Sequence, residues 1–130
     1  MARLFRRLGY RVEHTQASND HGADLLLKKG RKTIAVQAKD YAKPAGNKAV
    51  QEVFAAKAYY GCSEAWVVAS SGFTAGAMEQ AQPCEVRLLG EHELALLKRS
   101  AKARSILPAF IVVVTIVTFF SVLMFTKMGD

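Results

Sequence analysis

Residues 24–40, Asp-Leu-Leu-Leu-Lys-Lys-Gly-Arg-Lys-Thr-Ile-Ala-Val-Gln-Ala-Lys-Asp, decide the fold of this chain. Two apolar runs flank the basic turn at its centre, and this pattern predicts a β-hairpin with strands over residues 24–29 and 32–40. Gln37 and Lys39 are two positions apart on the second strand, so their side chains point to the same face. The hairpin therefore predicts a meeting of Asp24, which begins the first strand, with Gln37 and Lys39.

The segments around this hairpin predict a mixed α/β domain. Before it, the pattern indicates a helix over residues 1–9 and a strand over 10–15. After it, helices are expected over residues 47–60, 74–82 and 91–103, and strands over 64–70 and 85–89, with Asn47 and Thr74 as helix caps and Trp66, Tyr59 and Tyr60 in the core. The strand–helix–strand order in the second half predicts parallel pairing and an α/β sandwich.

The C-terminal part of the chain has no charged residue between Arg104 and Lys127. This interval of 22 residues would span roughly 33 Å as a helix, against about 30 Å for a hydrocarbon core. The pattern predicts a transmembrane helix over residues 106–126 with Pro108 in its first turn. A buried core helix is the alternative, but such helices are usually shorter and carry a polar face.

Charges beside the apolar segment predict how the chain is oriented. Its N-terminal flank carries Lys98, Arg99, Lys102 and Arg104, whereas Asp130 counters Lys127 on the other side. The positive-inside rule predicts a single-pass protein of the inner membrane whose folded domain faces the cytoplasm. The expected organisation is a domain over residues 1–98, a basic juxtamembrane linker over 99–105, the transmembrane helix over 106–126 and a short tail over 127–130.

Net charge and cysteine content narrow the class of protein. Residues 1–104 contain 17 of the 18 Lys and Arg and 10 of the 11 Asp and Glu, which gives them a net charge of +7. Such a domain suits nucleic acid or an anionic membrane surface, although solubility alone is a third explanation. Cys62 and Cys84 form no metal-type pair, and we expect free thiols in a reducing compartment.

The hairpin also carries a candidate metal site. Mg²⁺ prefers carboxylate, carbonyl and water oxygens, and Asp24, the Gln37 side chain and the Ala38 backbone carbonyl would supply three. Lys39 would position an attacking water, while the metal offsets charge on a phosphate. On spacing alone, ordinary surface residues are the simpler explanation.

Six segments, taken in order, resemble a known family. They are residues 19–24 (Asn-Asp-His-Gly-Ala-Asp), 36–41 (Val-Gln-Ala-Lys-Asp-Tyr), 46–53 (Gly-Asn-Lys-Ala-Val-Gln-Glu-Val), 58–61 (Ala-Tyr-Tyr-Gly), 65–68 (Ala-Trp-Val-Val) and 72–74 (Gly-Phe-Thr). Together they resemble the Mrr-like restriction endonucleases of the PD-(D/E)xK nuclease superfamily, over about residues 4–95.

This resemblance implies a fold, a reaction and a set of site residues. The fold is a restriction-endonuclease-like core, with a mixed central sheet flanked by helices, here followed by one C-terminal transmembrane helix. The reaction is hydrolysis of DNA phosphodiesters with Mg²⁺ or Mn²⁺. The catalytic aspartate of the family corresponds to Asp24, and its Glu-or-Gln-x-Lys motif to Gln37-Ala38-Lys39. Two cuts in a duplex need two sites, so a homodimer is a further expectation.

Other residues near the motif are weaker candidates. His21 and Asp20 would support the metal or phosphate, although turn roles compete for both. Gln51 matches a recurring family position on the following helix, while Lys43 and Lys48 would contact phosphates or be ordinary surface.

The chain also departs from the family pattern. Relatives usually carry a supporting glutamate on a longer first helix, whereas no acid precedes Glu13 here. The rival hypotheses are therefore a weak or inactive nuclease fold that binds DNA or serves as a membrane scaffold, and a membrane-bound interaction protein without a nucleic-acid role.

Overall fold

A computed structural model describes residues 1–16, 21–39 and 42–129 of the chain. Its centre is one five-stranded mixed sheet, and the strands lie side by side in the order in which they occur in the sequence. The strands are β1 (Arg11–His14), β2 (Leu25–Lys29), β3 (Lys32–Lys39), β4 (Glu64–Ala69) and β5 (Val86–Leu89), and the helices are α1 (Ala2–Arg7), α2 (Asn47–Tyr59), α3 (Ala75–Ala81) and α4 (Glu91–Met128).

The predicted hairpin and crossover are both confirmed. Strands β2 and β3 pair antiparallel, with Lys29 opposite Lys32 at the turn and Leu25 opposite Val36 near the other end. Strand β1 adds to β2 in antiparallel orientation, whereas β3, β4 and β5 are parallel. Helix α2 connects β3 to β4 and helix α3 connects β4 to β5, which is the arrangement that strand–helix–strand units require.

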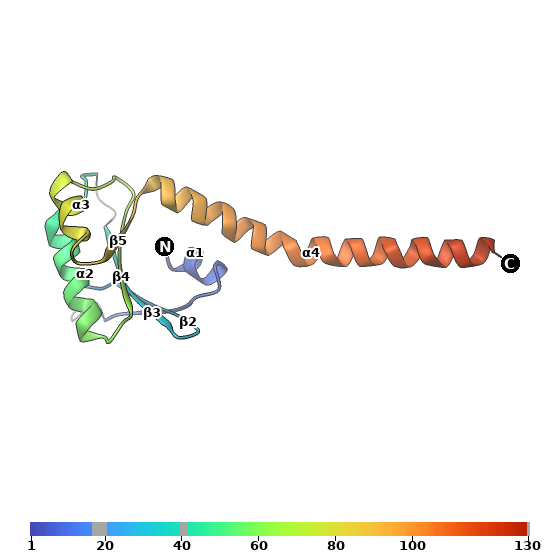
Figure 1. Cartoon of the computed structure of the whole chain (residues 1–130), viewed down its shortest axis with the longest axis horizontal. Helices are drawn as coiled ribbons and strands as arrows, with labels where there is room; N and C mark the ends of the chain where they lie inside the picture. The colour runs from blue at the N-terminus through green and yellow to red at the C-terminus, as the bar shows by residue number, and fades with distance from the viewer. Residues whose placement is uncertain (17–20, 40–41, 130) are drawn as a thin grey trace.

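Each face of the sheet is covered by its own helices (Figure 1). Helices α2 and α3 cover one face, where Val50 and Val53 are completely buried with Val67. Helix α1 and the first part of α4 cover the other face, where Phe5 lies 6.1 Å from Trp66 between ring centroids. Burying both faces of the central strands explains the continuous apolar run of β4.

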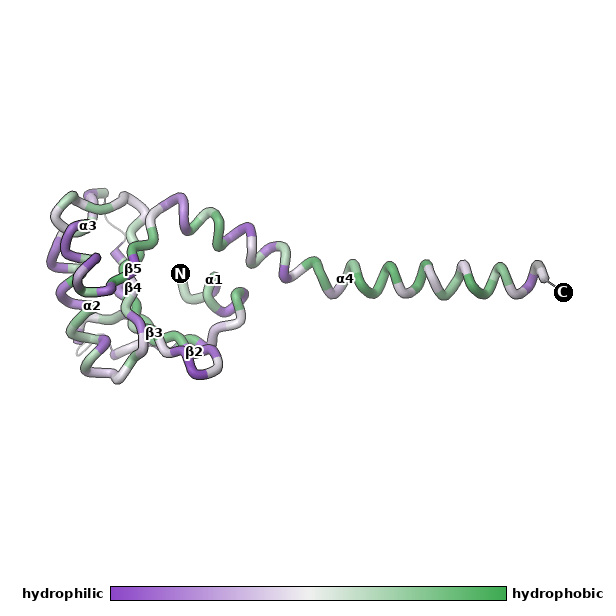
Figure 2. Tube along the Cα trace, viewed as in Figure 1, coloured by the Kyte–Doolittle hydropathy of each residue, from purple (hydrophilic) through white to green (hydrophobic). Residues whose placement is uncertain are grey.

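Helix α4 continues far beyond the folded domain. Figure 2 shows mixed hydropathy in its first part and nearly uniform hydrophobic residues in the part that projects away. In the part of the chain that is described, residues 91–127 are the one helical stretch long and apolar enough to cross a membrane, and its most apolar window is not buried. The helix is uninterrupted through residues 99–105, so the predicted linker is itself helical.

Three predictions made from local sequence are wrong. Pro108 lies inside α4 rather than in a first turn, and the helix changes direction where it leaves the domain (Figure 1). Gly46 rather than Asn47 occupies the cap position of α2. Tyr59 is 62% exposed because it lies on the outer side of α2, whereas Tyr60 packs against the core as predicted. Thr74, in contrast, is confirmed as the cap of α3, since its side chain accepts a hydrogen bond from the Ala77 N–H at 3.2 Å.

Candidate active site

Asp24 lies where the hairpin predicts it, directly across from the end of β3. One of its carboxylate oxygens accepts hydrogen bonds from the Gln37 amide nitrogen at 3.0 Å and from the Ala38 backbone N–H at 2.8 Å. Its own backbone N–H donates to the Val36 carbonyl at 2.8 Å, which continues the strand pairing up to this residue. The carboxylate is therefore held in one orientation by both side-chain and backbone donors.

Gln37 has a polar atom that its surroundings do not satisfy. The side chain is only 5% exposed, and its amide oxygen is buried without a hydrogen-bond partner among the described residues. A buried acceptor without a hydrogen-bond partner costs folding free energy. This oxygen and the Asp24 carboxylate are of the type that Mg²⁺ or Mn²⁺ binds. Because the Gln37 amide nitrogen is the atom that faces Asp24, the amide would have to turn over for both residues to hold one ion. No group of three His, Cys, Asp or Glu suited to a metal exists among the residues described.

Lys39 follows on the same face of β3 and points toward α2. Its ammonium lies 3.1 Å from one oxygen of Glu52, whose other oxygen lies 3.7 Å from the Lys48 ammonium. Lys39 and Glu52 are largely buried, with side chains 21% and 28% exposed, so this pair is screened less than a surface pair. Glu52 therefore fixes the direction of the lysine.

Glu52 is a residue that the sequence did not single out. It lies inside the segment that resembles the family, but its role depends on how α2 is rotated against the sheet. The loop before β2 packs tightly on the same turn of α2. A Cβ atom on Gly22, whose φ is +86°, would overlap the Glu52 carbonyl group. This close approach couples the Asp24 loop to the helix that holds Lys39.

Two open cavities adjoin these residues. One, of about 540 Å³, is lined by Asp24 and Ala38 together with His14 and two arginines of α1, Arg3 and Arg6. The other, of about 560 Å³, is lined by the three lysines Lys39, Lys43 and Lys48 and by the loop that precedes α2. Cationic side chains thus flank the carboxylate on both sides, which suits a polyanion.

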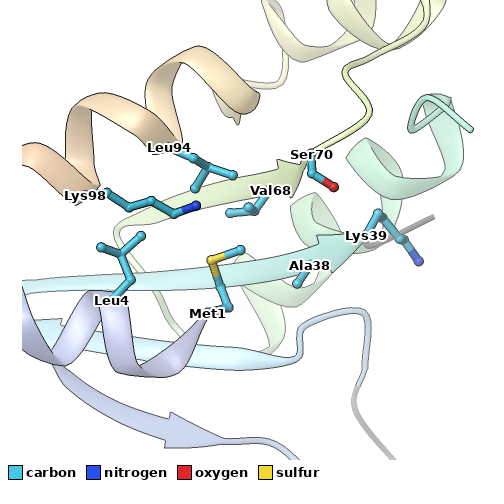
Figure 3. A pocket seen from close by; sticks show the side chains of 8 residues that line it. All are labelled: Met1, Leu4, Ala38, Lys39, Val68, Ser70, Leu94 and Lys98. Atoms are coloured by element: carbon cyan, nitrogen blue, oxygen red, sulfur yellow. The ribbon is translucent and has the colours of Figure 1, made fainter. Parts of the chain in front are cut away.

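A third cavity, of about 270 Å³, lies between β3, β4 and the two helices α1 and α4. Figure 3 shows Lys98 of α4 reaching into it beside Leu94, whereas Lys39 at its rim points away from the other lining residues. Ala38 lines both this cavity and the one beside Asp24. Lys98 therefore adds a cation from α4 to the surroundings of the site.

The supporting candidates fall in different places. His21 stacks on Tyr59 with ring centroids 3.9 Å apart, and its φ is +45°, as expected for a turn residue. Gln51 is exposed on α2. Asp20 lies outside the described residues. Cys62 and Cys84 are free thiols as predicted.

Comparisons with known proteins agree on the fold. Similar solved structures include AF1548, described as a protein of unknown function (TM-score 0.58, 17% identity, 68% of this chain and 53% of that one). They also include AspBHI, a DNA modification-dependent restriction endonuclease (TM-score 0.56, 21% identity, 79% of this chain and 30% of that one). MspJI, a restriction endonuclease in complex with a 27-mer oligonucleotide, gives a TM-score of 0.53 at 21% identity over 74% of this chain and 25% of that one.

These structures confirm the predicted restriction-endonuclease-like fold. The chain spans about half the length of AF1548 and less than a third of the other two. No curated protein matches it in sequence. Residues 1–97 match the model of the restriction endonuclease family Mrr_cat. Because this match covers most of the 130 residues, the chain belongs to the Mrr_cat restriction endonuclease family.

Proposed function

We propose that this chain is a membrane-tethered DNA endonuclease of the restriction and defence type that depends on Mg²⁺ or Mn²⁺. The observation that carries the proposal is the hydrogen-bonded pair of Asp24 and Gln37, with Lys39 fixed next to them. Family membership supports a nuclease, and the bound oligonucleotide of MspJI supports DNA as the partner.

Each residue has a defined part in the proposed reaction. Asp24, the Gln37 amide oxygen and the Ala38 carbonyl would hold the divalent ion. That ion would offset negative charge on the scissile phosphate. Lys39 orients the attacking water through its ammonium group, and Glu52 holds Lys39 in place. Arg3, Arg6, Lys43 and Lys48 contact backbone phosphates, which requires positive charge but no base recognition.

A plasmid assay tests the activity. The full chain in detergent micelles is incubated with supercoiled plasmid and Mg²⁺ or Mn²⁺, with a chelator as the blank. We expect nicking by the unaltered chain and by Glu79→Gln, a change at an exposed position on α3. Asp24→Asn and Lys39→Ala should lower the rate by about 100-fold or more. Equal rates for Asp24→Asn and the unaltered chain would contradict the proposal.

The second candidate function is a DNA-binding scaffold without nuclease activity, and the small number of acidic side chains at the site favours it. The described residues offer no cluster of three metal-binding side chains, so the ion would be held weakly without DNA. If the chain binds plasmid with a steep salt dependence but never nicks it, a DNA-binding scaffold is the correct function. Absence of both nicking and binding would leave a membrane-bound interaction protein.

The membrane tether is supported by the projecting part of α4. Its most apolar window is not buried, and the basic flank lies on the domain side. We propose a single-pass location in the inner membrane with the domain in the cytoplasm, and a homodimer where both strands are cut. Carbonate extraction and protease treatment of spheroplasts test the location: the chain should stay with the membrane, and its domain should resist protease until the cells are lysed.

A further inference from the structure

Basic side chains gather at the end of the sheet that is opposite the candidate active site. We call this group the hairpin patch, and it consists of Arg11, Lys28, Lys29, Arg31, Lys32 and Arg104. Lys29 faces Lys32 across the turn, whereas Gln37 lies near the other end of β3. Gln37 is five positions along the strand from Lys32, a distance of about 17 Å. The hairpin patch is therefore not part of the Asp24 site.

One carbonyl group joins the hairpin to the membrane-directed helix. The Leu8 carbonyl, at the end of α1, accepts hydrogen bonds from the Lys29 ammonium at 3.0 Å and from the Arg104 guanidinium at 3.1 Å. Arg104 is the last charged residue before the 22 uncharged residues of α4. The Lys29 side chain therefore lies next to that of Arg104, and Figure 1 shows the hairpin on the side of the domain from which α4 departs.

The hairpin patch keeps most of its positive charge. Glu13 lies 3.7 Å from Arg11 and 3.6 Å from Lys28, and Glu64 lies 2.7 Å from Lys32. Two carboxylates against six cations leave a net charge of +4. The Arg11 side chain is 79% exposed and that of Lys28 is 49% exposed, so the charge faces solvent.

We propose that the hairpin patch docks on anionic phospholipid headgroups at the membrane that α4 enters. A basic residue close to an anionic leaflet strengthens binding by about fivefold, and only within about 8 Å of the surface at physiological salt. The shared contact with Leu8 places the Lys29 ammonium within about 6 Å of the Arg104 guanidinium, the last charge before the proposed membrane segment. Docking at this end directs the Asp24 end of the sheet away from the bilayer, toward DNA. The inference rests on the proposed tether but not on nuclease activity.

The single tryptophan of the chain offers a label-free test. Trp66 is buried and hydrogen-bonds to Glu64, the partner of Lys32, so it lies just behind the hairpin patch. The full chain is placed in nanodiscs that contain a dansyl-headgroup lipid, and energy transfer from Trp66 is measured. We expect about twofold higher transfer with roughly a third phosphatidylserine than with phosphatidylcholine alone. The difference should disappear at about 1 M salt, where the screening length is about 3 Å.

A pair of charge-matched variants localises the effect. Lys28→Gln, Arg31→Gln and Lys32→Gln together should abolish the response to phosphatidylserine. The control combines Arg3→Gln, Lys43→Gln and Lys48→Gln, which removes the same charge from the cavities beside Asp24 and Lys39 and should preserve the response. Circular dichroism verifies that both variants fold, and the lipid and salt dependence of the unaltered chain stands independently of either variant.

Three results would overturn the inference. The first is equal transfer in neutral and anionic nanodiscs for the unaltered chain. The second is loss of duplex DNA binding in the hairpin variant with an unchanged lipid response, which would make the hairpin patch a DNA interface. The third is failure of the chain to enter nanodiscs, which would also remove the proposed tether. A chain that docks on anionic lipid but never cuts DNA would refute the nuclease and leave the docking intact.

Discussion

At the scale of single residues, Glu52 determines where the Lys39 ammonium lies. Replacing Glu52 with Gln keeps the shape of the side chain but removes the charge that holds Lys39 at 3.1 Å. We expect DNA cleavage to slow by about 100-fold, because a displaced catalytic group loses its alignment. DNA affinity should remain or rise, since a negative charge is lost beside three lysines. Single-turnover kinetics and a binding titration separate the two effects, and an unchanged cleavage rate would exclude this role.

Gly22 is the other residue on which the site geometry depends. Its φ of +86° is unfavourable for any other residue, and a Cβ atom would also overlap the backbone of Glu52. Gly22→Ala should destabilise the protein by about 2–3 kcal/mol and weaken the contact between the Asp24 loop and α2. Gly30→Ala is the matched control, because Gly30 also has a positive φ of +59° but open space around it. If urea denaturation shows that both variants lose the same free energy of unfolding, the overlap with Glu52 does not contribute to the loss.

At the scale of elements, the start of α4 depends on the ionisation of Glu93. Its carboxylate accepts a hydrogen bond from the Gly90 N–H at 2.9 Å. Bonds from its own backbone N–H and from Gly90 lower the pKa of Glu93 below its usual value of 4.5. Because the folded pKa is the lower one, this contribution is present at neutral pH and is lost as the pH falls through the folded pKa.

Thermal unfolding of Glu93→Gln tests this dependence on pH. We expect its Tm to lie below that of the unaltered chain at pH 7, and the difference to shrink below about pH 4. Glu91→Gln is the control, since Glu91 is in the same first turn but makes no capping bond in the described structure. A difference in Tm that stays constant down to acidic pH would contradict the capping role.

Thr74 caps the start of α3 with an uncharged hydroxyl group. Thr74→Ala removes the acceptor for the Ala77 N–H and should cost about 1 kcal/mol of unfolding free energy. Thr74→Ser retains the hydroxyl group and should recover most of the loss. If the serine variant is as unstable as the alanine variant in urea, the methyl contact rather than the hydrogen bond is responsible.

Elements that depend on nearby residues are the ones that the sequence predicts. The hairpin follows from two apolar runs around a basic turn, and the Thr74 cap from a hydroxyl before a helix. The meeting of Asp24 and Gln37 follows from the hairpin register. The Lys39–Glu52 pair does not, because it depends on how Val50 and Val53 rotate α2 against the sheet. The sequence also did not predict that Pro108 lies inside α4. The helix begins directly after Gly90, far before the apolar segment, so the apolar segment alone does not indicate where the helix starts.

At the scale of the whole molecule, α4 links the domain to the projecting segment without a flexible joint. Its first part packs on α1, where Leu94 and Ala101 are buried, and Arg104 anchors it to Leu8. In the proposed bilayer, the domain would therefore tilt together with α4 but would not turn about it. Helix α4 changes direction where it leaves the domain (Figure 1), so a rotation of the domain about the first part of α4 would change which of its faces meets the proposed bilayer.

Inserting alanines between Arg104 and Ser105 tests this rigid coupling. Two residues would rotate the domain by about 200°, and four would rotate it by about 400°, which is close to the original direction. Transfer from Trp66 to dansyl headgroups in anionic nanodiscs should therefore fall with two alanines and largely recover with four. If only the added length mattered, energy transfer should fall steadily, because two residues lengthen the helix by about 3 Å and four lengthen it by about 6 Å. A steady fall would show that the helix does not set the direction, whereas recovery at four would show that helical phase presents the hairpin patch to the bilayer.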